Sequence, residues 1–149
     1  MDVAELKQRL AHEPQALPLP ESLLQSSLSP DYALVEAALS WQQSADNHHL
    51  VCIDDPFYPP LLKQITDPPT VLFLKGHIDG LLFPSIAIVG SRNATVGGKK
   101  VAYELATQLA GQGLSITSGM ALGIDGVAHQ AAIDIGKPSL AVLGTGVDV

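Results

Sequence analysis

The fold is decided by residues 86–117, which read IAIVGSRNATVGGKKVAYELATQLAGQGLSIT. Ile86–Val89 is apolar throughout, which is typical of a strand buried on both faces of a parallel sheet. Residues 98–111 then change to a helical period and end at a glycine. Leu114–Thr117 predicts a second short strand. The predicted buried stripe of the helix comprises Val101, Ala102, Leu105 and Leu109.

The same alternation continues towards the end of the chain. Ser118-Gly119 ends the second strand, and an alanine-rich helix is predicted from Ile124 or Asp125 to Ala132. Ser139–Leu143 predicts a third strand. This β-α-β-α-β order with short connections indicates a Rossmann-like α/β fold, with a parallel sheet and right-handed crossovers.

The first half of the chain has a different pattern. We expect a small helical N-terminal domain over residues 1–47, followed by an extended Rossmann-like domain over residues 48–149. Residues 48–84 form a proline-rich connector with two short strands. In the N-terminal domain we expect a first helix that contains Leu6 and Leu10. A second helix is capped by Ser29, has Pro30 at its first position and carries an apolar stripe of Leu34, Val35, Ala38 and Leu39. The two strands of the connector are expected at His49–Ile53 and Val71–Leu74.

Composition indicates a globular protein of ordinary domain size. Of the 149 residues, 46% are hydrophobic and 15% charged, so the chain can bury a core. Cys52 is the only cysteine, which excludes an intrachain disulfide framework. The sequence has neither a signal-peptide pattern nor an apolar run of about 20 residues. We therefore expect a cytoplasmic protein that does not enter a membrane.

The net charge of −7 argues at first against a nucleic-acid partner. Its distribution weakens that objection. Residues 1–85 carry four basic and eleven acidic side chains, whereas residues 86–149 carry four of each. The excess acidity therefore lies outside the glycine-rich half, in which Arg92, Lys99 and Lys100 lie close together in sequence.

The three predicted strands of the sheet all end in small or hydroxyl residues. These ends are Gly90-Ser91, Ser118-Gly119 and Gly144-Thr145-Gly146. Ligands of such sheets bind beyond the carboxyl ends of the strands, where small residues expose the backbone and hydroxyl groups donate to phosphate. Arg92 adds a guanidinium fork. The pattern predicts an anion-binding surface, although a glycine in a single loop would only permit a tight turn.

Familiar cofactor motifs do not fit these loops. Residues 90–98 do not follow G-x-G-x-x-G, and no acidic residue ends the second strand, which argues against NAD. Residues 97–100 are similar to the end of a Walker A loop, but Lys100 stands where Ser or Thr is needed for Mg²⁺. We expect no cofactor.

Two pairs of residues invite a catalytic or metal-binding interpretation. Asp125 and His129 stand at i, i+4 on one helix and could form an acid/base pair. A structural role is favoured, in which Asp125 caps the helix or pins the preceding glycine loop. His48 and His49 have no third ligand at metal-binding spacing, so we expect no metal site.

Three stretches together resemble the DNA processing protein DprA (Smf) family. They are residues 86–92 with Thr95, residues 118–129 (SGMALGIDGVAH), and residues 141–146 (AVLGTG). The connector is also similar to the family, in YPPLL, DPP, LF and Gly76, so that the resemblance covers about residues 50–149. Residues 1–47 resemble a sterile-alpha-motif fold more loosely.

The resemblance implies a protein that is not an enzyme, binds single-stranded DNA, protects it during natural transformation and helps to load the RecA recombinase. It also implies a homodimer for the full-length protein. Leu122 stands where many members have Arg, and because the chain stops at Val149 we expect an N-terminal portion with an incomplete Rossmann-like sheet. The predicted DNA- and phosphate-binding residues are Gly90, Ser91, Arg92, Thr95, Lys99, Ser118, Gly119, Gly123, Gly144, Thr145 and Gly146.

An enzyme is the alternative. The cytokinin-activating phosphoribohydrolases have a related fold and act on nucleotides. Their P-G-G-x-G-T loop and catalytic Arg/Glu pair are not found in this sequence.

Overall fold

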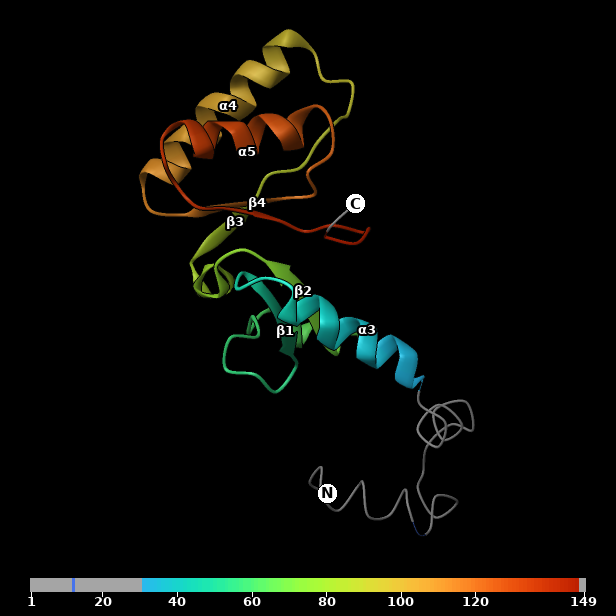
Figure 1. The fold of residues 1–149 in the computed structure, drawn as a ribbon. Helices are drawn as coiled ribbons and strands as arrows, with labels where there is room; N and C mark the ends of the chain where they lie inside the picture. The colour runs from blue at the N-terminus through green and yellow to red at the C-terminus, as the bar shows by residue number, and fades with distance from the viewer. Residues whose placement is uncertain (1–11, 13–30, 148–149) are drawn as a thin grey trace. The chain divides into compact units, whose positions relative to one another are not determined.

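The computed structural model describes His12 and residues 31–147 of the chain (Figure 1). The chain divides into two compact units, Met1–Trp41 and Gln42–Val149. The predicted helix containing Leu6 and Leu10 lies outside the described residues. The predicted domain boundary between residues 47 and 48 stays a prediction.

Helix α3 (Tyr32–Gln43) is the predicted helix that carries Leu34 and Leu39. Asp31 caps it, because its Oδ1 accepts hydrogen bonds from the backbone N–H groups of Ala33 (3.1 Å) and Leu34 (3.2 Å). The prediction of Ser29 as the cap is therefore wrong. Asp is as good a capping residue as Ser, and the Ser-Pro-Asp sequence offered both.

The connector contains the two predicted strands as an antiparallel pair. Strand β1 (His48–Cys52) pairs with β2 (Val71–Lys75), with Leu50 opposite Phe73. Between them the chain is held by Tyr58, which is 2% exposed and donates its hydroxyl to the carbonyl of Pro69 at 2.7 Å. Two short 3₁₀ helices complete this region, η2 (Leu62–Gln64) and η3 (Ile78–Leu82).

The rest of the second unit is the predicted β-α-β-α-β segment. Its first strand was predicted wrongly as Ile86–Val89 and buried on both faces, because it ends at Ala87 and Val89 is 71% exposed. Its three strands are all parallel, in the order β3-β4-β5, as the Rossmann-like fold class requires. Figure 1 shows α4 and α5 together on one side of this sheet. The elements are β3 (Ser85–Ala87), α4 (Val96–Gly111), β4 (Ser115–Ser118), α5 (Ile124–Asp134) and β5 (Ser139–Ala141).

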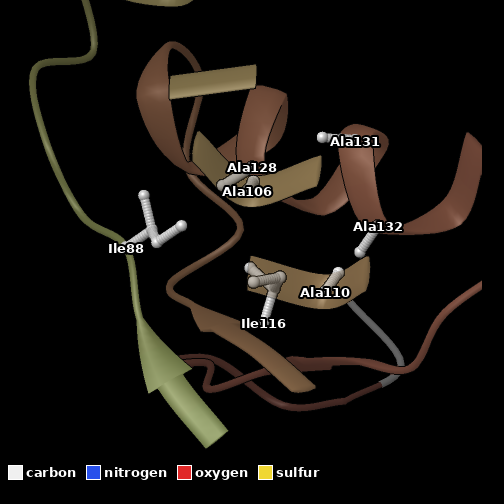
Figure 2. Packing of buried hydrophobic residues seen from close by; sticks show 7 residues of the cluster. All are labelled: Ile88, Ala106, Ala110, Ile116, Ala128, Ala131 and Ala132. Carbon is white, nitrogen blue, oxygen red and sulfur yellow. The ribbon is translucent and has the colours of Figure 1, made fainter. Parts of the chain in front are cut away.

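The core between this sheet and the two helices is built from alanine and isoleucine (Figure 2). On α4 the buried residues are Ala102, Ala106 and Ala110, which recur every four residues along one face. The predicted stripe was therefore partly wrong, since Val101 is 63% and Leu105 is 47% exposed. Periodicity could not choose between two adjacent apolar rows. Packing against the alanines of α5 selected the row with small side chains, because these let the helices approach closely. The cluster comprises Ile88, Ala106, Ala110, Ile116, Ala128, Ala131 and Ala132.

Candidate functional site

Three loops follow the carboxyl ends of the parallel strands. We name them loop 1 (residues 88–95, after β3), loop 2 (residues 119–123, after β4) and loop 3 (residues 142–147, after β5). Because the strands are parallel, all three loops leave the same edge of the sheet, where α/β proteins bind their ligands. Of the predicted anion-binding residues, Ser118 is the last residue of β4, Lys99 lies in the first turn of α4, and all the others lie in these three loops.

One carboxylate joins loops 1 and 2. Asp125 is the second residue of α5 and only 6% exposed. Its Oδ1 accepts the N–H of Gly90 at 3.2 Å, and its Oδ2 accepts the N–H of Gly119 at 3.2 Å. The position at a helix N-terminus further stabilises the negative charge. Asp125 therefore pins the preceding glycine loop and, in addition, the loop 35 residues away in sequence.

Loops 1 and 2 also touch through their backbones at Gly123. This residue has φ +88°, and an added Cβ would lie 2.2 Å from the carbonyl oxygen of Ser91 and 2.6 Å from that of Arg92. The N–H of Ile124 donates to the same Ser91 oxygen at 3.2 Å. Only glycine permits this conformation and this approach. Gly123, predicted to bind phosphate, thus serves as the contact surface between two loops.

The hydroxyl of Ser118 is also used inside the protein. Ser118 is 3% exposed, and its Oγ donates to the carbonyl oxygen of Ile88 at 2.6 Å. Together with the N–H groups of Gly90 and Gly119, this hydroxyl holds the loops in place. These three groups were predicted to donate to phosphate, but each already donates to an acceptor within the protein. They are therefore not available to a ligand.

Loop 1 and the start of α4 present the donors that remain. Ser91, Arg92 and Lys99 are exposed, and among the described residues no acceptor pairs with the N–H groups of Ser91 and Arg92. Thr95 caps α4, since its Oγ1 accepts the N–H of Gly98 at 3.1 Å and leaves its own hydroxyl hydrogen free. The helix accordingly begins at Val96, two residues earlier than predicted. These groups form a surface rich in donors.

Loop 3 is less tightly tied to the others. Gly144, Thr145 and Gly146 are exposed, and the Thr145 hydroxyl donates to the Gly146 carbonyl at 3.3 Å. The N–H of Val142 continues the pairing with β4 by donating to Ser118 at 2.9 Å. Within residues 31–147, no hydrogen bond joins loop 3 to loop 1. The structure therefore brings the predicted residues of loops 1 and 2 together, but not those of loop 3 with loop 1.

No pattern in the sequence predicts the contact between Asp125 and Gly90. Spacing predicts neighbours within one helix or across one turn, and these two residues belong to different elements. The same holds for the approach of Gly123 to Ser91. Both contacts depend on the order of the strands, which places loop 1 beside loop 2.

His129 lies one turn after Asp125, buried at 8% exposure, with its Nδ1 2.6 Å from the Oγ of Ser139. Burial lowers the pKa of His129 below 6.5, while the Ser118 backbone and the Asp125 charge oppose this shift by favouring the charged ring. Both members of the possible acid/base pair are thus enclosed and held by protein groups. This arrangement suits a structural role.

The stability of the protein should fall as the pH falls below about 6.5, the ordinary pKa of His129. Because its folded pKa is the lower one, the unfolded chain binds the proton first, and stability is lost until the folded pKa is passed. Urea unfolding between neutral and mildly acidic pH measures the loss. His129→Gln should flatten part of the profile. His77→Gln, which replaces an exposed histidine, is the control for the substitution itself. An equally steep profile for His129→Gln would contradict the assignment.

Two further observations concern metal ions and membranes. Across His12 and residues 31–147, no group of three or more His, Cys, Asp or Glu side chains is placed to hold a metal ion. His49 instead contacts the Gly76 carbonyl through Nε2 at 3.2 Å. In the same part of the chain, no helix is long and apolar enough to cross a membrane.

Comparison with known proteins identifies similar sequences. Residues 49–149 match the protein family described as DNA recombination-mediator protein A. Protein Smf of Escherichia coli (strain K12) is 43% identical over 114 residues, which cover 76% of this chain and 30% of that protein. DNA processing protein DprA of Streptococcus pneumoniae is 45% identical over 95 residues, covering 64% of this chain and 33% of that protein. The chain thus spans about a third of the length of these relatives.

Two solved structures are similar in fold as well. The X-ray structure of DprA from Streptococcus pneumoniae matches with a TM-score of 0.72 and 32% identity, over 100% of this chain and 48% of that one. DprA from Helicobacter pylori, whose structure describes a single-stranded DNA binding mode, matches with a TM-score of 0.58 and 29% identity, over 68% of this chain and 45% of that one.

Proposed function

This chain belongs to the DNA recombination-mediator protein A family, and on that premise we propose that loop 1 and the start of α4 bind the phosphates of single-stranded DNA. The similar protein from Helicobacter pylori binds single-stranded DNA. The observation that carries the proposal is the donor surface of loop 1, where Ser91 and Arg92 are exposed and their N–H groups have no acceptor among the described residues.

The chemistry of this surface suits a phosphate chain. Backbone N–H groups and the hydroxyls of Ser91 and Thr95 donate to phosphate oxygens without reading the base. The N-terminus of α4, a helix of 16 residues, adds its positive end. Arg92 offers two parallel donors to one phosphate, and Lys99 a mobile charge.

Local charge supports binding despite the acidic total. Arg92 and Lys99 take part in no ion pair within the described part of the chain, so both are available to an anion. Lys100 lies 3.9 Å from Glu104 on the exposed side of α4. Since phosphate contacts release counterions, binding should weaken steeply as salt rises.

The wider role that we propose is non-enzymatic. The protein would cover single-stranded DNA in the cytoplasm, act with a RecA-type recombinase and form a homodimer as the intact protein. The burial of Asp125 and His129 supports a role without catalysis, because neither side chain is open to a substrate. We propose loop 3, with Gly144, Thr145 and Gly146, as a secondary contact to the same strand.

Arg92→Ala should weaken binding of labelled oligo-dT by roughly 10-fold or more, the value of a lost charge-assisted hydrogen bond. It should also reduce the slope of log K against log salt by about 0.7, the contribution of one phosphate contact to a single strand. Fluorescence anisotropy of the intact protein over a salt series measures both.

Lys137→Ala is the matched control for Arg92→Ala. Lys137 is exposed and precedes β5, at the opposite edge of the sheet from the loops, so its removal should leave affinity and slope nearly unchanged. Absence of binding by the unchanged protein at low salt would refute the proposal. Release of ribose 5-phosphate from nucleoside monophosphates would favour a phosphoribohydrolase instead.

A further inference from the structure

We propose that Asp125 is a positioning residue for the nucleic-acid site, which sets the spacing of loops 1 and 2 and does not itself contact the ligand. This inference rests on the proposed function of these loops. It assigns to a buried acidic residue a role in binding an anion, through the hydrogen bonds that the residue makes within the protein.

The contacts of Asp125 leave its carboxylate no freedom. One oxygen accepts from Gly90 and the other from Gly119, each at 3.2 Å. A Cβ added to Gly119 would lie 3.1 Å from Oδ2, so the backbone of loop 2 packs directly on the carboxylate. A shift of Asp125 would therefore move both loops.

The identity of the partners explains why a carboxylate is required. Both partners are N–H donors, and a carboxylate is the side chain that accepts at both ends. Asn has nearly the same shape but would turn an NH₂ group towards one of the two N–H groups. That loop would lose its hydrogen bond and face a repelling donor.

The charge of Asp125 makes the inference sharply testable. A negative charge beside a phosphate site weakens phosphate binding by Coulomb repulsion. If charge alone mattered, removal of this carboxylate would strengthen binding. If the spacing of the loops matters more, removal would weaken it, so the two explanations predict changes of opposite sign.

Asp125→Asn should weaken oligo-dT binding by roughly 10-fold, the value of a hydrogen bond to a charged group. Asp134→Asn is the control. Asp134 lies exposed on the same helix, where it accepts from Tyr103 and Gln130, and the substitution removes the same charge. That variant should bind as well as the unchanged protein or slightly better. Equal or tighter binding by Asp125→Asn would overturn the proposal.

A general loss of stability must be separated from misplaced loops. Ile116→Val destabilises the core but removes none of the hydrogen bonds that join the loops. It should therefore keep full affinity below its unfolding temperature, whereas a variant with misplaced loops would bind weakly even when folded. If Asp125→Asn does not fold, Gly119→Ala tests the proposal in its place. It displaces Oδ2 at constant charge and should weaken binding. Gly111→Ala is its control, because Gly111 is the last residue of α4, far from the proposed site, and nothing lies within 4 Å of the added Cβ. Unchanged affinity of Gly119→Ala would then refute the proposal.

Amide hydrogen exchange tests Asp125 without any ligand. The N–H groups of Gly90 and Gly119 should be protected in the unchanged protein and should exchange faster in Asp125→Asn, with little change at Ala128 in the core. If the unchanged protein does not bind DNA but shows this pattern, the proposed function fails while the link between the loops stands. Unchanged exchange at both glycines would refute the link itself.

Discussion

Gly123→Ala should destabilise the protein by about 3 kcal/mol or more. Two causes add. The backbone at Gly123 has φ +88° and ψ −125°, which side chains rarely tolerate. The new Cβ would also lie 2.2 Å from the Ser91 carbonyl oxygen, a backbone atom that cannot turn away. Loops 1 and 2 would have to separate, and DNA binding should be lost with them. Urea unfolding and oligo-dT binding measure the two losses.

Gly113→Ala is the matched control for Gly123→Ala. Gly113 has a similar φ of +93°, but nothing lies within 4 Å of an added Cβ. Its substitution should cost only the conformational term, about 1–2 kcal/mol, and should leave DNA binding intact. If both substitutions cost the same, the close approach of the two loops contributes nothing to stability.

Ile116→Ala should cost about 2–5 kcal/mol, because it empties a site in the centre of the core. Ile116 is 0% exposed on the middle strand, and Figure 2 shows its side chain among the alanines of the two helices. Alanine side chains cannot extend into the space left by isoleucine, so the cavity would stay open. Thermal and urea unfolding measure the change.

Two further substitutions serve as controls for Ile116→Ala. Ile116→Val removes one methylene group and should cost about 0.5–1.5 kcal/mol. Ile133→Ala removes the same atoms as Ile116→Ala from a site on α5 that is 60% exposed, and should change stability by no more than about 0.5 kcal/mol. A large effect at Ile133 would mean that this face of α5 is covered in solution.

The fold was largely predictable because its elements are signalled locally. Ile86–Val89 and residues 98–111 differ in period, and the order of such segments leaves few topologies open. The errors arose where local signals were degenerate. Two apolar rows ran side by side on α4, and both Ser29 and Asp31 suited a helix cap.

The position of the candidate site could be predicted from the sequence, but the role of each residue in it could not. Strand-end loops with Gly, Ser and Arg indicated where an anion would bind. The different roles of Ser118 and Ser91 could not be inferred, because in the sequence both serines follow a predicted strand and stand beside a glycine. The buried one donates to Ile88, and the other is exposed.

The sequence by itself determined the elements, their parallel order, and the clustering of small and basic residues after the strands. These properties depend on the periodicity and chemistry of neighbouring residues. Only the tertiary structure decided which groups hold the site and which remain open to a ligand. That decision depends on contacts such as Gly90 with Asp125, made between segments that are distant in sequence. Once a hydrogen bond inside the protein occupies a donor, the donor is no longer available to a phosphate.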